Sequence, residues 1–314
     1  MKYFGKKVIT FILTLLIVSF LVFLAFALIP GDPAVSKLGT QATPQKLEEM
    51  REEMGLNAPV LVRYAKWLLQ ALTGDFGTSY SYSIPVTQMI LEKLPVTLVL
   101  SGYSFLLMIA LSIPFGIFMA RHHGRRLDRV MQVINQVLMA IPPFFMGMIL
   151  TLLFGLTFHL FVPGGYVSYK DDFTGFLSYL FFPALAIALP KAAMAAKLLR
   201  SSLIEEENKD YVRTAYSRGN TSHDVFYRHM LKNACLPVLT FCAMALADMI
   251  AGSIVVEQVF SIPGLGRILL SSIQNRDYPV VVAVILCIAA VVLLINLLVD
   301  LLYHKLDPRI RIRT

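Results

Sequence analysis

The chain has 314 residues, of which 57% are hydrophobic and only 15% are charged, and this composition excludes an ordinary water-soluble domain. Its net charge of +8 does not require a nucleic-acid partner, because most basic residues lie in segments that flank long apolar blocks. The sequence contains no phosphate loop (G-x-x-x-x-G-K-S/T), no H-E-x-x-H and no G-x-S-x-G, which argues against ATP binding by that route and against an intramembrane enzyme.

Six apolar blocks follow one another along the chain, and each is long enough for a helix that crosses a bilayer, which needs roughly 20 residues. They are residues 8–28, 94–120, 130–169, 173–199, 236–256 and 278–299. Strands of a membrane barrel would be about half as long, with strict alternation. We therefore predict an all-α polytopic membrane protein with six transmembrane helices.

The first block ends in Ala25-Phe26-Ala27 and could pass for a secretory signal with its cleavage site. Because the apolar run is longer than a signal core, we expect it to be retained as the first transmembrane helix. Lysine and arginine then assign the two sides of the membrane. With the N-terminus inside, 18 of the 28 basic residues fall on the inner side. Both termini and a polar island, residues 205–237, are therefore predicted to be cytoplasmic.

Residues 30–93 form the only sizeable external segment. It opens with the turn signature PGDP, and Thr43 with Pro44 starts a helical stretch that Gly55 ends. A second amphipathic stretch, residues 60–72, carries the only tryptophan, Trp67, and leads into GDFGTSYSYSIPV. Tryptophan and tyrosine prefer the bilayer interface, so this segment should lie against the outer face. Two interpretations stay open: a cap that packs on the helix ends, and a platform or gate for an incoming ligand or carrier protein.

The stretch RHHGRRLDR joins the second and third blocks and contains His122 and His123. Adjacent histidines point in different directions and no third ligand is near, so the stretch is interpreted as a basic cytoplasmic loop rather than a metal site. In the third block, Pro142 and Pro143 should kink the helix, and Gly147 allows a neighbouring helix to come close.

Two charged residues fall inside apolar blocks, Lys191 in the fourth and Asp248 in the fifth. Such residues are costly in a membrane and indicate function by default. We expect both to face the bundle interior, either as a structural pair or beside a translocation route. A proton relay is disfavoured, because only His159 near an outer end could join them. The three cysteines are expected to be reduced packing residues, without a disulfide or zinc site.

The polar island has the pattern of helix, tight turn and helix. Residues at helical spacing predict one face of the first helix: Ile204, Asn208, Tyr211, Val212 and Ala215. Gly219 and Asn220 tolerate positive φ and interrupt this pattern. Thr221, with Asp224 three residues on, resembles a capping box that starts the second helix, and Pro237 lies where the next apolar run begins.

The chain resembles, nearly end to end, the dipeptide/oligopeptide/nickel class of ABC-importer permeases, as the first of the two permease subunits of such systems. The stretches that carry the resemblance are PGDP, GLNAPVLVRYAKWLLQALTGDFGTSY, LPVTLVL, DYVRTAYSRG, RHMLKNACLPVL and VEQVFSIPGLG. It implies a MetI-like ABC permease fold in the bacterial plasma membrane. The organisation expected is residues 1–29 as tail and first helix, 30–93 as the external segment, 94–303 as a five-helix core with a coupling loop at 200–236, and 304–314 as a tail.

By the same resemblance the polar island corresponds to the EAA loop, with Ala215, Gly219 and Leu236-Pro237 at its characteristic positions. The first motif residue is usually acidic, whereas here Arg213 and Thr214 precede the alanine. The resemblance makes the helix before Gly219 the coupling helix that docks on an ATPase. The ATPase-coupling residues would be Asp210, Tyr211, Arg213, Thr214, Ala215, Tyr216, Ser217, Arg218, Gly219 and Asn220. The loop anchors would be His229, Asn233, Leu236 and Pro237.

The implied mechanism is alternating access without catalysis by this chain. Its partners would be a second permease subunit in a heterodimer, two cytoplasmic ABC ATPases that hold ATP and Mg, an extracytoplasmic substrate-binding protein and membrane lipid. No cofactor, metal or nucleic acid is expected on the chain itself. A peptide is favoured as substrate because the spans show no cluster of acidic or histidine ligands. The alternatives are nickel or a metal chelate in the same architecture, an ion-gradient-driven secondary transporter that Asp248→Asn would inactivate, and a membrane enzyme.

Overall fold

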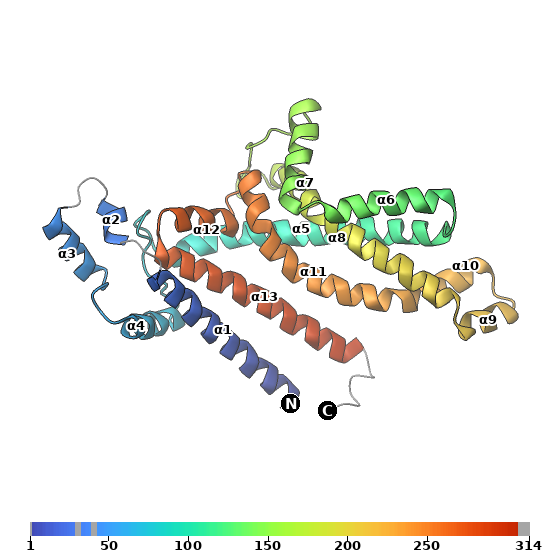
Figure 1. The fold of residues 1–314 in the computed structure, drawn as a ribbon, viewed down its shortest axis with the longest axis horizontal. Helices are drawn as coiled ribbons and strands as arrows, with labels where there is room; N and C mark the ends of the chain where they lie inside the picture. Colours follow the sequence, from blue (N-terminus) through green and yellow to red (C-terminus); the bar gives the residue numbers. More distant parts are fainter. Residues whose placement is uncertain (1, 29–32, 39–42, 307–314) are drawn as a thin grey trace. The chain divides into compact units, whose positions relative to one another are not determined.

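The computed structural model describes residues 2–28, 33–38 and 43–306, and these are mostly helical. Within these ranges the sole strand-like pairing is an isolated bridge between Thr78 and Pro85, so the predicted all-α class is confirmed. The PGDP turn before Pro33 and the tail from residue 307 lie outside the described residues. The chain divides into two compact units: residues 1–97 together with 263–314, and residues 98–262. Figure 1 traces the helices in chain order.

In the described part of the chain, five helices are long and apolar enough to cross a membrane, and a bent helix pair makes a sixth if it is counted as one span. The five are Gly5–Leu28, Val86–Arg121, Phe173–Glu207, Ser222–Val259 and Tyr278–Val299. Each of the six predicted blocks therefore has a counterpart. The first of these five helices is the least covered by its own chain, since only 6% of its most apolar window is buried.

The first unit pairs the two ends of the sequence. Helix α1 (Lys2–Leu28) and helix α13 (Tyr278–Leu306) lie side by side and run in opposite directions (Figure 1). The start of α1 and the end of α13 are thus at the same end of this unit, as two termini on one side of a membrane require. Helix α12 (Leu265–Gln274) packs against α13.

The segment predicted as external also belongs to the first unit, where it forms short helices. They are α2 (Pro33–Leu38), α3 (Pro44–Glu53) and α4 (Val60–Leu72). Thr43 caps α3 and Gly55 follows it with a φ of +65°, both as predicted. Helix α4 has the predicted bounds and packs against α1. Helix α5 (Val86–Arg121) starts in the first unit, about two turns before the predicted block, and continues into the second.

The second unit is built around α8 (Phe173–Glu207), which packs against α6 (Arg126–Ala140), α7 (Pro143–Leu150) and α11 (Leu231–Val259). Buried alanines follow one another along α8: Ala184, Ala186, Ala188, Ala192, Ala193, Ala195 and Ala196. Small side chains let helix backbones approach closely, which is how helices associate in a membrane. At Gly116 of α5, an added Cβ would lie 3.0 Å from the Ala196 carbonyl oxygen, so α5 also lies close to α8.

The two prolines break the third block instead of kinking one helix. Helix α6 ends at Ala140, Ile141 is extended with a ψ of 120°, and α7 begins at Pro143. The segments Arg126–Ala140 and Pro143–Thr157 meet at 106°. Neither proline has an amide hydrogen to donate, and the residue before a proline avoids the helical conformation, so two in succession stop the helix. After α7 the chain continues as a π-helix, η2 (Thr151–Thr157).

The polar island differs from the prediction in two ways. Lys209 takes an extended conformation, with a ψ of 149°, so that α8 ends at Glu207 and a separate helix, α9 (Asp210–Ser217), follows. The helical face predicted from Ile204 to Ala215 is therefore divided between two helices. The second helix, α10 (Ser222–Asp224), continues through the π-helix η3 (Val225–Met230) into α11 without a stop. Pro237 consequently lies inside a helix and does not mark where one begins.

Candidate functional site

Helix α9 lies at one end of the second unit, where α8 ends and α10 begins (Figure 1). The turn after it has the predicted construction. Gly219 adopts a φ of +84°, and Thr221 caps α10 by accepting a hydrogen bond from the Asp224 amide at 3.2 Å. No heavy atom lies within 4 Å of the place that a Cβ on Gly219 would take. The requirement for glycine is therefore conformational and not steric.

Helix α9 has one buried and one exposed face. Val212 is 2% exposed and Ala215 is 6% exposed, and the helix packs on η3. The exposed surface is mostly polar, with Asp210, Arg213, Thr214 and Ser217, and it also includes Tyr216, which is 47% exposed. From the sequence we expected the small Ala215 to approach a partner. The structure instead places it against this chain, where it lets α9 lie close to η3, and so the surface that α9 offers outward is the polar face.

A buried carboxylate at the end of α8 holds α9 in place. Glu206 is 8% exposed and accepts hydrogen bonds from Lys209 Nζ at 2.5 Å and from the Tyr211 hydroxyl. The side chain of Asn233 on α11 lies close to Glu206 and to Tyr211. The hydrogen bond to Glu206 raises the pKa of Lys209, and burial together with the same carboxylate raises the pKa of Tyr211. Both donors therefore keep their protons at neutral pH, and one acidic residue joins α8 and α9.

Among the predicted loop anchors, Asn233 thus lies close to the end of α8 and to α9. His229, Leu236 and Pro237 occupy exposed positions on the same helix, and Leu236 is 61% exposed. The anchoring role of these three residues stays a prediction.

A second buried carboxylate, Asp128 in the first turn of α6, binds both α8 and the loop before α6. Arg200 Nε and Nη2 donate to the two carboxylate oxygens of Asp128 at 2.9 and 2.7 Å. Asp128 is 1% exposed and also accepts from the Gly124 amide at 3.2 Å. The ring Nδ1 of His123 lies 3.0 Å from Arg200 Nη2. In the described ranges no group of three or more His, Cys, Asp or Glu side chains is arranged to hold a metal ion.

The two charged residues inside the apolar helices form an ion pair. Lys191 Nζ of α8 lies 2.8 Å from Asp248 Oδ2 of α11, and this distance permits the pairing considered from the sequence. The pair is not buried within the chain, since the side chain of Lys191 is 23% exposed and that of Asp248 is 65% exposed. It lies on a face that this chain leaves open.

In the first unit, a third buried carboxylate closes the segment after α4. Asp277 is fully buried and accepts hydrogen bonds from Ser79 Oγ at 2.5 Å, from the Tyr80 amide at 3.0 Å and from the Ser81 amide at 3.2 Å. It lies immediately before α13, so it ties the GTSYSYS stretch to the last transmembrane helix. A carboxylate that several donors satisfy in this way fixes the loop conformation.

None of these three carboxylates was among the predicted site residues. Glu206 stands in the run EEE, and Asp128 and Asp277 stand beside arginines, and in such contexts acidic residues normally indicate solvent-exposed surface. A weak signal existed only for Asp277, which immediately precedes an apolar block. Its partners lie almost 200 residues earlier, and no spacing rule connects them.

Two family models match the chain: a binding-protein-dependent transport system inner membrane component over residues 112–312, and the N-terminal part of such membrane components over residues 1–101. The chain is 35% identical over 309 residues to a probable peptide ABC transporter permease protein of Sinorhizobium fredii, covering 98% of this chain and 99% of the relative. It is also 35% identical over 311 residues to an oligopeptide transport system permease protein of Bacillus subtilis, with 98% of each chain covered.

A glutathione transport system permease protein of Salmonella choleraesuis is likewise 35% identical over 311 residues, with 99% of each chain covered. Among solved structures, a chain of the MetNI methionine ABC transporter in an inward-facing conformation matches with a TM-score of 0.55 at 15% identity. The match covers 70% of this chain and 97% of that one. At this identity the likeness concerns the fold, and it confirms the expected MetI-like architecture.

Proposed function

The chain belongs to the family of binding-protein-dependent transport system inner membrane components, and from this premise we propose that it forms half of the translocation pathway of an ATP-driven importer of short peptides. It is a non-catalytic permease subunit and a multi-pass protein of the bacterial plasma membrane. In the proposed importer it works with a second permease subunit, two cytoplasmic ATPases and an extracytoplasmic binding protein.

The observation that carries the proposal is the attachment of α9. This helix offers a polar face, including Asp210 and Arg213, to a partner, while its apolar face packs on η3. Glu206 fixes it to the end of α8, and η3, on which it packs, continues into α11. A displacement of α9 by a partner would therefore be transmitted to both α8 and α11, as the coupling of ATP hydrolysis to transport requires.

The Lys191–Asp248 ion pair supports the proposal that a second permease subunit packs against this chain. Charged groups in a membrane are costly unless they face protein or water, and here more than half of the Asp248 side chain is open. We assign the open side to the interface with the second subunit, or to the pathway between the two subunits.

The proposal that the substrate is a short peptide rests on the names of the relatives, which refer to peptides, oligopeptides and glutathione, itself a tripeptide. The nickel alternative has no observation of its own in support, and peptide transport remains the better proposal.

The test is the substitution Gly219→Val, measured in proteoliposomes that contain the full transport system. Valine at a φ of +84° is strained by about 1–3 kcal/mol, although the site has room for its side chain. We expect ATP hydrolysis to continue while peptide uptake per ATP falls at least about tenfold. Gly124→Val is the matched control, because Gly124 also has a positive φ (+78°) and open space but lies in another loop.

Normal uptake in the Gly219→Val variant would contradict the role of α9. Uptake by this chain alone, driven by an ion gradient and lost in Asp248→Asn, would replace the ABC importer with a secondary transporter.

A further inference from the structure

The first unit contains a cavity of about 870 Å³. Its walls come from the end of α1, the turn after α3, helix α4, residues 76–83 and the start of α13. Small-molecule sites typically have volumes of about 300–1,000 Å³, so the cavity is large enough for a ligand of several residues. Neither the importer architecture nor the coupling of α9 requires it.

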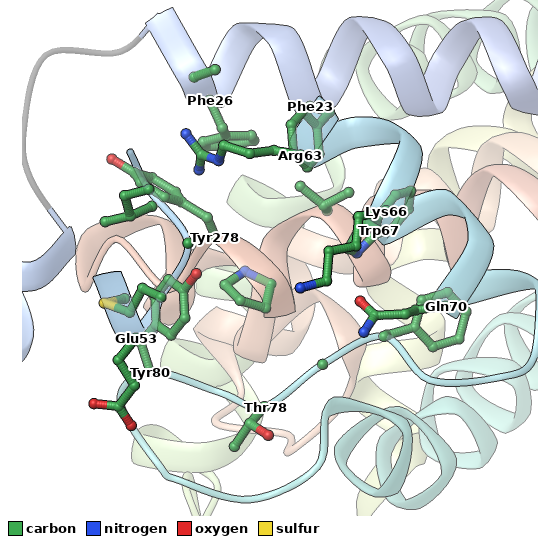
Figure 2. Close-up of a pocket in the computed structure, with 18 of the residues that line it drawn as sticks. Phe23, Phe26, Glu53, Arg63, Lys66, Trp67, Gln70, Thr78, Tyr80 and Tyr278 are labelled. Carbon is green, nitrogen blue, oxygen red and sulfur yellow. The ribbon is translucent and has the colours of Figure 1, made fainter. Parts of the chain in front are cut away.

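One wall of the cavity is cationic. Arg63, Lys66 and Gln70 lie on one face of α4, and neither cation forms an ion pair with a carboxylate that the structure describes. Figure 2 shows that the side chains of Lys66 and Gln70 extend from α4 into the cavity, whereas the carboxylate of Glu53 at the rim is directed away from it. Arg51 and Glu52 also line the cavity, so the lining holds three cations against two carboxylates, and the cationic side at α4 favours an anion.

Two further lining residues have polar groups that lack a partner. Trp67 Nε1 and the Tyr278 hydroxyl are buried and make no hydrogen bond with any described group. Each of these two atoms exposes less than 1 Å² and cannot be reached from the cavity, so the two residues line it through their other atoms. Opposite α4, the Tyr80 hydroxyl faces the cavity (Figure 2), and burial raises the pKa of Tyr80, which keeps this hydroxyl a donor at neutral pH.

The remaining lining is apolar and aromatic, and includes Phe23, Phe76 and Pro279. Such a surface accepts side chains of different shapes without selecting one, while the cations of α4 can bind a group that every ligand shares. For a family of short peptides, the shared anionic group is the C-terminal carboxylate.

We propose that this cavity is a subsite of the permease that binds the C-terminal carboxylate of a short peptide through Lys66 and Arg63, with the peptide side chains against the aromatic wall. The inference rests on the proposed function, because it takes the transported peptide as its ligand. It gives the external segment a direct contact with substrate, in addition to any contact with the binding protein.

The experiment uses the fluorescence of Trp67, the only tryptophan of the chain, in the full chain reconstituted in nanodiscs. Trialanine is titrated as the probe and trialaninamide, which lacks the carboxylate, as its matched control. We expect a saturable change with trialanine and binding at least about tenfold weaker with the amide, the factor expected when a charge-assisted hydrogen bond is lost. Lys66→Gln should weaken trialanine binding by about the same factor.

Lys46→Gln is the control variant, because Lys46 is exposed on α3 and does not line the cavity. Equal affinity for trialanine and its amide, or for the parent and Lys66→Gln, would overturn the inference. A Lys66→Gln variant that loses only affinity for the binding protein would also overturn the inference, because Lys66 would then contact a carboxylate of that protein and not of the peptide. If peptide uptake by the full system persists without any Trp67 response, the subsite is refuted while the importer function stands.

Discussion

The role of Glu206 leads to a prediction that the sequence alone could not provide. Glu206→Ala removes the carboxylate that Lys209 and Tyr211 share, without touching the exposed face of α9. The spans should still fold, because α8 and α11 pack along their buried alanines, but α9 should detach from them.

The magnitude follows from the donors that lose their acceptor. Tyr211 donates to the charged carboxylate, and such a hydrogen bond contributes about 1.5–3 kcal/mol. Lys209 has a side chain that is 45% exposed, and Asn233 is exposed as well, so the loss of their contacts should matter little. Because the released donors regain bonds to water, we expect a net effect of about 2 kcal/mol, or roughly thirtyfold more undocked α9.

Hydrogen–deuterium exchange of the full chain in nanodiscs measures this directly. The amides of residues 214–217, which carry the hydrogen bonds of α9, should exchange roughly thirtyfold faster in Glu206→Ala. Glu206→Gln keeps an acceptor oxygen and should show an intermediate effect, while Lys209→Gln should change exchange only a few-fold. Unchanged exchange in Glu206→Ala would refute the reasoning, as would a Lys209→Gln effect equal to it, because the exposed ion pair would then hold the helix.

Two further predictions follow from the other contacts. Asp277→Asn should place an amide donor against the Ser79 hydroxyl or a backbone amide, which costs about 1–3 kcal/mol of stability. The midpoint of thermal unfolding, followed by Trp67 fluorescence, should fall by several degrees. The exposed control Glu49→Gln should leave it unchanged. Alkaline pH should release α9, because the pKa values of Lys209 and Tyr211 are raised in the folded chain. The stability that these two groups give to the docked helix is complete below their ordinary pKa values of about 10. It is lost as the pH rises through their pKa values in the folded chain. A nitroxide on Ser217→Cys should gain mobility between about pH 10 and 12 in the parent and be mobile at neutral pH in Glu206→Ala; a label that stays immobile throughout would contradict this.

The membrane helices could be predicted because a single physical requirement, burial of about 20 apolar residues in lipid, determines them. The local signals at Thr43, Gly55, Gly219 and Thr221 also held, since caps and positive φ depend on neighbours within a few residues. The prediction failed where two signals competed. Pro142 and Pro143 together outweighed the apolar run and broke its helix, while Pro237 alone did not interrupt α11.

The position of α9 could be predicted, but not its orientation or its attachment. The helical spacing placed Tyr211, Val212 and Ala215 on one face without saying that this face turns inward. The carboxylate that fixes it is one of three adjacent glutamates, and only the break at Lys209 decides which of them is buried. The cavity of the first unit is assembled from five separate stretches, so no local pattern could have indicated it.

The contacts between α8 and α11 limit how a push on α9 can travel. Three polar ties join these helices along their length: Glu206 with Asn233 beside α9, Lys191 with Asp248 midway, and the Tyr179 hydroxyl with the Phe260 carbonyl at 2.5 Å near the far end. On α8 the outer two ties are separated by 27 residues, or about 40 Å of helix, and buried alanines fill the space between them. Sliding one helix along the other would break all three ties at once. A displacement of α9 should therefore move α8 and α11 as one body, with the Lys191–Asp248 pair intact.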